Sequence, residues 1–250
     1  MFPLILNSAQ DLTYYIKREI DVNELKIFDA RDLTSRFTCD VTYRCLYGID
    51  AKSFDCEKSP MLEYGRKFLK GIIRSLVSIF PLQMLSKDVE SFFANLTNDA
   101  INYRIKNNSG QNDMLTHAII LKQVKKLSDL EILGHCMTIF LNSFETSALT
   151  LQNMLFQLGI NSKVQEKLRS EIIKKIKTDE DFTYENVSEI SYLDQVFYET
   201  LRLHPGLVFT TRVSTEDINI KRSDGKDFML KKNSVIWIPI HSIHRDAGEK

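Results

Sequence analysis

Glycine and proline, the residues that most often mark turns in sheet-rich proteins, are scarce in this sequence. Its 250 residues include 9 Gly and 5 Pro. A protein built from many short strands needs such residues at its tight turns. The composition therefore favours a mainly α-helical fold and argues against a large sheet.

The sequence also lacks an excess of charge of either sign and any paired cysteine motif. Its 33 basic and 33 acidic side chains cancel, so a nucleic-acid partner is not expected. The four cysteines contain no C-x-x-C pair and have no histidine at zinc-finger spacing, which argues against a structural zinc site. They are Cys39, Cys45, Cys56 and Cys136. We expect reduced thiols in a protein that faces the cytosol.

No apolar run reaches the ~20 residues that a helix needs to span a bilayer. The most membrane-like stretch is Phe68–Leu85, which is interrupted by Lys70, Arg74 and Pro81. It could lie against a membrane surface, and it could equally be the buried end of a helix.

Apolar residues recur at helical spacing along the first three-quarters of the chain. Two stripes of every fourth residue predict one-faced helices. They are Leu33, Phe37, Val41 and Cys45, and Val164, Leu168, Ile172 and Ile176. Ser162 and Gln165 have the spacing of a capping box at the start of the second helix.

One helix is predicted to be unusually long. Ser128 and Glu131 form a capping box, and no proline interrupts the pattern before Gly159. A helix from Asp129 to Gly159 would be roughly 45 Å long. Because it is apolar on nearly every side, we expect it to be the central and most buried element.

The pattern changes after Pro205. Four short β-prone runs separated by turn residues predict small antiparallel strands. They are Val208–Val213, Asp217–Ile220, Phe228–Leu230 and Val235–Ile240. We expect one domain over 1–250, mainly α, with a helical part (1–205) and a small antiparallel β part (206–250).

A polar patch, Asn142–Ser147, interrupts the apolar pattern of the long helix. Burying a carboxylate and several hydroxyls is costly unless they are paired. An acid next to a hydroxyl can relay protons into a dry site. The alternatives are a polar network that ties neighbouring helices together and a solvated helix face.

A second polar pair stands in ETLRLHP, where Glu199 and Arg202 are three residues apart and share a helix face. Taken alone, the pair indicates a surface salt bridge, which contributes little to stability.

The order of these motifs resembles that of the cytochrome P450 family. FLNSFETSALTL (140–151) is similar to the family's distal helix, and Glu199-x-x-Arg202 is similar to its Glu-x-x-Arg helix. The segment 161–172 resembles the helix between these two motifs, and 238–246 follows the family's order of strands. The segment 28–50 also fits an animal, insect-like microsomal member, and the resemblance covers essentially the whole chain.

The resemblance implies an incomplete cytochrome P450 fold and a haem b cofactor. It implies a monooxygenase at the endoplasmic-reticulum membrane, on its cytosolic face, that takes electrons from an NADPH-dependent cytochrome reductase. Such an enzyme inserts one oxygen atom from O2 into an apolar small molecule, of the xenobiotic or endogenous lipid and hormone type.

Roles for individual residues follow from the resemblance. Glu145, Thr146 and Ser143 would be catalytic and carry protons. Arg212 and Asn142 would bind the cofactor, Arg212 through a haem propionate. Glu199 and Arg202 would be structural. Apolar side chains would line the substrate pocket, namely Phe140, Phe144, Leu207, Val208 and Phe209.

Two features depart from the family pattern. Asn142 and Ser143 stand where the family has a pair of small residues beside the cofactor, where a glycine opens a groove for dioxygen and water. Neither Cys45 nor Cys136 has the surroundings of the family's haem ligand, so we assign no metal ligand within these 250 residues.

We therefore expect the 250 residues alone to be an inactive internal fragment. The missing segments would include the membrane anchor, the cysteine loop and the Arg that completes the Glu-x-x-Arg triad, so we also expect an unfilled donor face on Arg202. The alternative function is a non-catalytic fragment or pseudoenzyme with at most a hydrophobic-ligand or interaction role.

Overall fold

The structure is a computed structural model that describes residues 1–24, 26–55, 59–77, 85–107, 113–221, 225 and 227–246. The side chains of 69–77 lie outside this description. The chain divides into two compact units, Met1–Ile190 and Ser191–Lys250, which we call unit 1 and unit 2.

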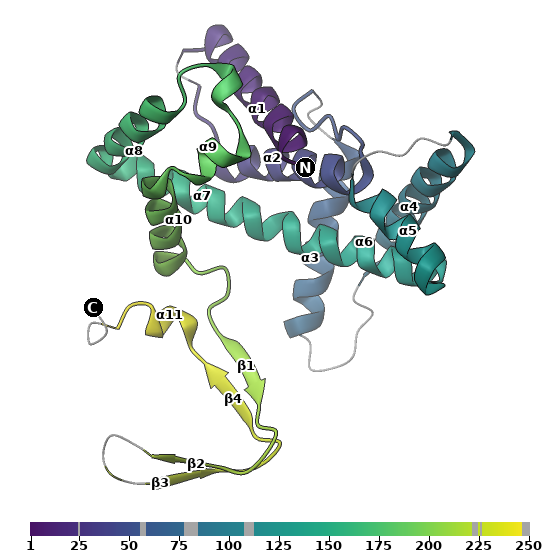
Figure 1. Cartoon of the computed structure of the whole chain (residues 1–250), viewed down its shortest axis with the longest axis vertical. Coiled ribbons are helices and arrows are strands. Elements are labelled where there is room, and N and C mark those ends of the chain that lie inside the picture. The colour runs from purple at the N-terminus through teal and green to yellow at the C-terminus, as the bar shows by residue number, and fades with distance from the viewer. Residues whose placement is uncertain are drawn as a thin grey trace. The chain divides into compact units, whose positions relative to one another are not determined.

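Unit 1 is helical (Figure 1). Its helices are α1 (Phe2–Val22), α2 (Ala30–Tyr47), α3 (Pro60–Val77), α4 (Lys87–Asn107), α5 (Met114–Lys125), α6 (Asp129–Ser143), α7 (Glu145–Ile160), α8 (Ser162–Lys175), a 3-10 turn (Asp179–Asp181) and α9 (Tyr184–Ser188).

Unit 2 combines one longer helix with two small sheets. Its elements are α10 (Ser191–Leu203), β1 (Thr210–Val213), β2 (Ile218–Lys221), β3 (Asp227–Leu230), β4 (Val235–Ile238) and α11 (Ile240–Ile243). Strand β1 pairs antiparallel with β4, and β2 pairs antiparallel with β3. The predicted mainly α fold with a small antiparallel β region is confirmed.

Local sequence signals place several elements correctly. Ser128 and Glu131 form the predicted capping box at the start of α6. In α8 the stripe that includes Leu168 faces inward. Its capping box is absent, because Asn161 is the N-cap residue of α8 and makes no side-chain cap bond. Ser162 is already inside the helix.

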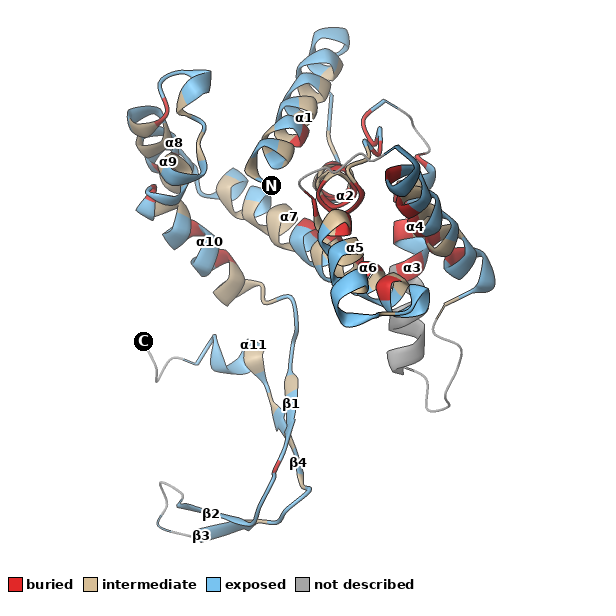
Figure 2. Ribbon diagram, turned by 45° about the vertical axis from the view of Figure 1, so that its right-hand side comes forward, coloured by how far each residue is buried: buried red, intermediate tan, exposed pale blue. Residues whose placement is uncertain are grey.

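Among the described residues, helix α2 rather than the predicted long helix is the most buried helix of unit 1 (Figure 2). It contacts α1, α3, α5, α6 and α7. Several of its buried residues are polar, and they are satisfied locally. The hydroxyls of Thr34 and Thr38 donate to the carbonyls four residues earlier, at 2.8 and 3.0 Å, and Asp40 accepts from the Ser53 amide at 3.2 Å.

The prediction that the long helix is the most buried element is therefore wrong. Phe140 is fully buried, and Leu133 and Leu151 are partly buried. In α7, however, Ala148 is the one fully buried residue among those described, while Leu155 and Phe156 are exposed.

The core of unit 1 is a cluster of aromatic side chains from α2, α3, α4 and α6. The ring of Phe140 is its centre, with centroid distances of 4.9 Å to Phe93, 5.3 Å to Phe144, 5.4 Å to Tyr43 and 5.9 Å to Phe68. Tilted and edge-on contacts of this kind stabilise aromatic pairs beyond their buried area.

Candidate functional site

The predicted long helix is broken at one residue, in the middle of the polar patch. Phe144 separates α6 from α7, with φ −75° and ψ −74°. Its amide still donates to the Phe140 carbonyl at 3.0 Å, and its carbonyl accepts from the Ala148 amide at 3.2 Å. The two helices therefore run on from each other with a local distortion between them (Figure 1).

Hydroxyl groups on both sides of the break bond to carbonyls of the preceding turn. Thr146 Oγ1 donates to the Asn142 carbonyl at 2.6 Å, and Ser143 Oγ donates to the Ile139 carbonyl at 2.7 Å. Such bonds compete with the helix amides and bend helices. They give a physical reason for the break at Phe144.

The two hydroxyls face different surroundings. Ser143 is half-buried and accepts a hydrogen bond from the Thr42 hydroxyl of α2 at 3.2 Å. Thr146 and Asn142 are exposed on the surface of unit 1. Of the hydroxyls considered for proton transfer, Thr146 is thus accessible, whereas Ser143 belongs to the contact between α2 and α6.

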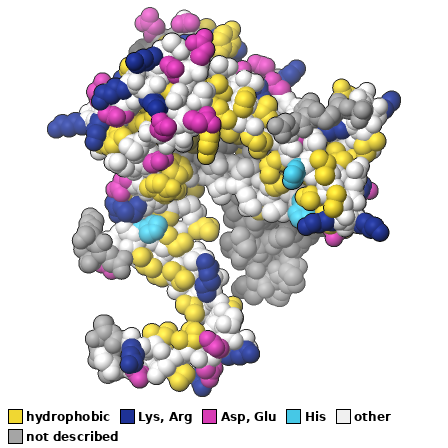
Figure 3. Space-filling model, viewed as in Figure 1, with side chains coloured by type: hydrophobic (Ala, Val, Ile, Leu, Met, Phe, Trp, Pro, Cys, Tyr) yellow, Lys and Arg dark blue, Asp and Glu magenta, His cyan; other side chains and the backbone are white. Residues whose placement is uncertain are grey.

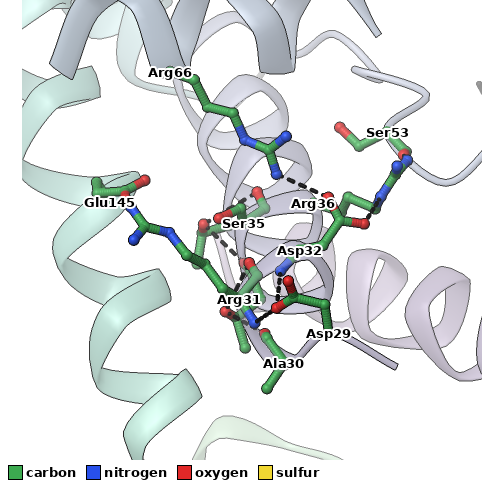
Figure 4. A network of polar contacts seen from close by, with 11 residues as sticks. Asp29, Ala30, Arg31, Asp32, Ser35, Arg36, Ser53, Arg66 and Glu145 are labelled. Carbon is green, nitrogen blue, oxygen red and sulfur yellow. Dashed lines mark hydrogen bonds and ion pairs between the residues drawn. The ribbon is translucent and has the colours of Figure 1, made fainter. Parts of the chain in front are cut away.

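Glu145, the first residue of α7, forms an ion pair with Arg31 in the first turn of α2 (Figure 4). Arg31 Nη2 lies 2.5 Å from Glu145 Oε1. The side chain of Glu145 is 15% exposed and that of Arg31 is 63% exposed. The carboxylate is thus mostly withdrawn from water, while its cationic partner reaches solvent.

Sequence reasoning did not find Arg31. The two residues are 114 positions apart, and no local pattern distinguishes Arg31 from the other surface arginines. The chemistry that this arrangement allows is proton exchange, because a carboxylate with a solvent-facing partner lies next to a hydroxyl.

The aromatic residues expected to line a substrate pocket lie inside the core. Phe140 and Phe144 are 0% and 2% exposed, and their rings stack at 5.3 Å. In this structure both rings belong to the closed aromatic cluster, so their substrate role stays a prediction.

In unit 2, Glu199 and Arg202 form the predicted ion pair on α10. Arg202 Nε and Nη2 donate to the two carboxylate oxygens at 2.7 and 2.6 Å. This contact raises the pKa of Arg202. The prediction that Arg202 keeps an unfilled donor face is wrong, because its Nη1 donates to the His244 carbonyl at 2.7 Å. Arg245 Nη2 donates to the Leu203 carbonyl at 2.7 Å. These two bonds connect the end of α10 to the turn after α11.

The remaining predicted residues of unit 2 lie around β1. Arg212 is exposed, and its Nη1 donates to Thr210 Oγ1 at 3.1 Å and to the Thr211 carbonyl at 2.8 Å. Leu207, Val208 and Phe209 are exposed, as are other hydrophobic side chains of this unit (Figure 3). The ring of Phe209 packs against Trp237 of β4, with 4.4 Å between the centroids.

The described cysteines do not fit the role of an axial ligand to haem iron. Cys39, Cys45 and Cys136 are free and buried. Burial raises the pKa of Cys39 to about 12 and that of Cys136 to about 11, and it also raises the pKa of Cys45. A cysteine side chain binds a metal ion as the thiolate, and a raised pKa disfavours that form. Cys56 lies outside the described residues.

The described residues contain no group of three or more His, Cys, Asp or Glu side chains that could hold a metal ion. No helix in the same residues is long and apolar enough to cross a membrane. Most of the stretch Phe68–Leu85, considered for membrane contact, lies outside the described side chains.

Comparison with known proteins gives a consistent match. The family model described as Cytochrome P450 matches residues 1–249. Among curated proteins, the chain is similar to three from Drosophila melanogaster. Probable cytochrome P450 6a13 is 32% identical over 98% of this chain and 52% of the relative. Probable cytochrome P450 309a1 is 31% identical over 96% of this chain and 50% of the relative. Probable cytochrome P450 6a23 is 29% identical over 98% of this chain and 52% of the relative. The chain thus spans about half the length of the curated relatives it matches.

Proposed function

Since this chain belongs to the cytochrome P450 family, we propose that it is part of a haem-dependent monooxygenase that inserts one oxygen atom from O2 into an apolar small molecule. The observation that carries the proposal is the acid and hydroxyl pair at the helix break. Glu145 and Thr146 follow Phe144 directly, with the carboxylate paired to a solvent-facing arginine and the hydroxyl exposed.

Haem is the cofactor of this family. When bound, the haem would supply the oxygen chemistry, because a thiolate ligand donates electron density that favours O–O cleavage. The described residues fit it in part. Arg212 offers an exposed guanidinium for a propionate carboxylate, whereas none of the described cysteines fits as its ligand.

The proposed roles of the chain's own residues follow from their contacts. Glu145 would exchange protons with water at its carboxylate, and Thr146 would pass a proton on through its hydroxyl after releasing the Asn142 carbonyl. Ser143 and Asn142 would support this turn, Ser143 through its bond with Thr42 of α2.

Substrate contacts are proposed in both units. Leu207, Val208 and Phe209 offer exposed apolar surface in unit 2. Phe140 and Phe144 would reach a substrate if the aromatic cluster opened. The substrate would be apolar, of the xenobiotic or endogenous lipid and hormone type.

The redox partner and the cellular location of the protein are proposed from its family membership. An NADPH-dependent cytochrome reductase would supply the electrons, and the protein would work at the endoplasmic-reticulum membrane on its cytosolic face. We also propose that units 1 and 2 belong to one domain, which is supported by a family match that runs through both.

A second candidate is a non-catalytic chain with an apolar-ligand or interaction role. The burial of all three described thiols, each with a raised pKa, favours it.

One spectrum separates the two candidates. The full-length protein that contains residues 1–250 is expressed with haem, reduced, and exposed to carbon monoxide. A monooxygenase should give the strongly red-shifted Soret band of a thiolate–carbon monoxide complex, and it should form product with NADPH and reductase. Absence of the band from folded protein would contradict the proposed function and support the second candidate.

A further inference from the structure

The ion pair between α2 and α7 points to a residue that the acid and hydroxyl motif does not include. The carboxylate of Glu145 is oriented by Arg31, which comes from a different helix and a distant part of the sequence (Figure 4). We propose that Arg31 is a positioning residue for proton delivery, holding the Glu145 carboxylate at the seam between α2 and α7. This inference rests on the proposed function.

Arg31 is well placed to hold a partner still, because its backbone is fixed. Asp29 caps the N-terminus of α2, accepting hydrogen bonds from the amides of Arg31 at 2.8 Å and Asp32 at 3.3 Å. The helix behind it is the most buried in unit 1. A group carried by a helix is placed more precisely than one carried by a loop.

Glu145, in contrast, stands where the backbone is least regular. It follows the break at Phe144 directly, and the hydroxyls of Ser143 and Thr146 bond to carbonyls of the preceding turn. Without a partner, the carboxylate at this position would be free to turn with the first residues of α7. The guanidinium restricts that motion.

Helix α2 contacts the residues on both sides of the break. Thr42 donates to Ser143, the last residue of α6, and Arg31 donates to Glu145, the first residue of α7. The two contacts make α2 the support of the distorted turn. Of the two, only the Arg31 contact reaches the acid.

The charged groups around Arg31 do not replace its contact with Glu145. Asp32 in the same turn is occupied by Arg36 at 2.7 Å and by Arg66 at 2.8 Å. Those arginines lower the pKa of Asp32 against the opposing effect of its burial. Arg66 therefore provides a matched control, because it belongs to the same network and pairs with Asp32 instead of Glu145.

The test compares Arg31→Gln, Glu145→Gln, the double variant and Arg66→Gln in the haem-containing enzyme. The readout is product formed per O2 consumed. Arg31→Gln should lower this ratio by up to about 10²-fold, as expected when a reacting group is misplaced by about 1 Å. Glu145→Gln should lower it at least as much, and the double variant should fall no further than Glu145→Gln. Arg31→Lys, which keeps the charge, should restore at least half of the loss, and Arg66→Gln should leave the ratio unchanged.

A second readout does not depend on turnover. In urea unfolding, Arg31→Gln and Glu145→Gln should each lower the midpoint, and the double variant should lower it by less than the sum, because both changes remove one contact. Additive shifts would overturn the proposed contact.

The outcomes separate the inference from the function it rests on. An unchanged ratio in Arg31→Gln with a lowered ratio in Glu145→Gln would overturn the role of Arg31 and leave the relay intact. An unchanged ratio in Glu145→Gln would overturn both.

Discussion

Replacing Arg104 by methionine should destabilise unit 1 by about 3–5 kcal/mol, because the change leaves a buried carboxylate without its partner. Arg104 on α4 and Asp113 at the start of α5 are 7% and 1% exposed in their side chains. Arg104 Nη1 and Nη2 each donate to one oxygen of the Asp113 carboxylate at 2.5 Å.

The size of this destabilisation follows from the other hydrogen bonds that the Arg104 guanidinium donates. It donates to the Tyr47 carbonyl at the end of α2 at 2.5 Å and to Thr116 Oγ1 at 2.8 Å. Hydrogen bonds to charged groups are worth about 1.5–3 kcal/mol each, and the methionine side chain recovers part of the buried apolar contact. A loss of about 3–5 kcal/mol is a large share of the ~5–15 kcal/mol that stabilises a domain.

The assay is urea unfolding followed by far-UV circular dichroism, with two comparisons. Arg169→Met is the control, since Arg169 and Glu166 form an exposed pair at 3.6 Å that is worth ~0–1 kcal/mol. Adding Asp113→Asn to Arg104→Met should recover stability, because the amide is neutral and can still cap α5. A loss below about 1 kcal/mol in Arg104→Met, or a further loss in the double variant, would refute the reasoning.

Three smaller predictions concern packing and ionisation in unit 1. Gly65→Ala should be less stable than wild type by about 1–2 kcal/mol, because its new Cβ would lie 2.9 Å from Phe140 Cζ. The new Cβ of Gly134→Ala meets nothing within 4 Å among the described residues, so this variant should be more stable than wild type by about 0.5–1 kcal/mol. Equal effects of the two changes in urea unfolding would argue against the packing account. Tyr43→Phe should be neutral or stabilising by up to about 1 kcal/mol, because the Tyr43 hydroxyl is buried without a hydrogen-bond partner in the described part of the chain; a loss above about 1 kcal/mol would show that the hydroxyl is satisfied. Because burial raises the pKa of Cys136 from 9.0 to about 11, its contribution to stability should be complete below pH 9 and fall by about 1.4 kcal/mol per pH unit above it. Cys136→Ala should show a shallower fall between pH 9 and 11, and an equally steep fall would contradict this cause.

Features that depend on neighbours along the chain could be predicted from the sequence. The capping box at Ser128 is one, since both of its partners lie within one turn. The positive φ of Asn233, +65°, is another, because asparagine tolerates the left-handed region. The strands also appear where the β-prone runs predicted them, with ends that differ by at most two residues.

The errors arise where distant residues decide the structure. Helix α2 looked one-faced because its buried polar residues were counted as surface, although Thr34, Thr38 and Asp40 are satisfied inside the fold. No proline or glycine lies next to Phe144, so the sequence gives no signal of the helix break there. The His244 carbonyl that fills the free donor of Arg202 lies 42 residues away.

The candidate site shows the same division. The residues Glu145 and Thr146 could be found from their order in the motif, since an acid beside a hydroxyl in an apolar helix is visible in the sequence. Their surroundings could not be found, because the partner of Glu145 is 114 residues away. The separation of Ser143 from Thr146 also depends on packing against α2.

The central claim is that Thr146 delivers protons during oxygen insertion, and it is tested most directly by product formed per O2 consumed in Thr146→Ala. Thr150→Ala is the matched control, because its hydroxyl donates to the Thr146 carbonyl at 3.0 Å one turn further along α7. General acid catalysis contributes ~10²–10⁴-fold to rate, so Thr146→Ala should still consume O2 while losing most of its product, and Thr150→Ala should stay at the wild-type ratio. A wild-type ratio of product to O2 in Thr146→Ala would contradict the account.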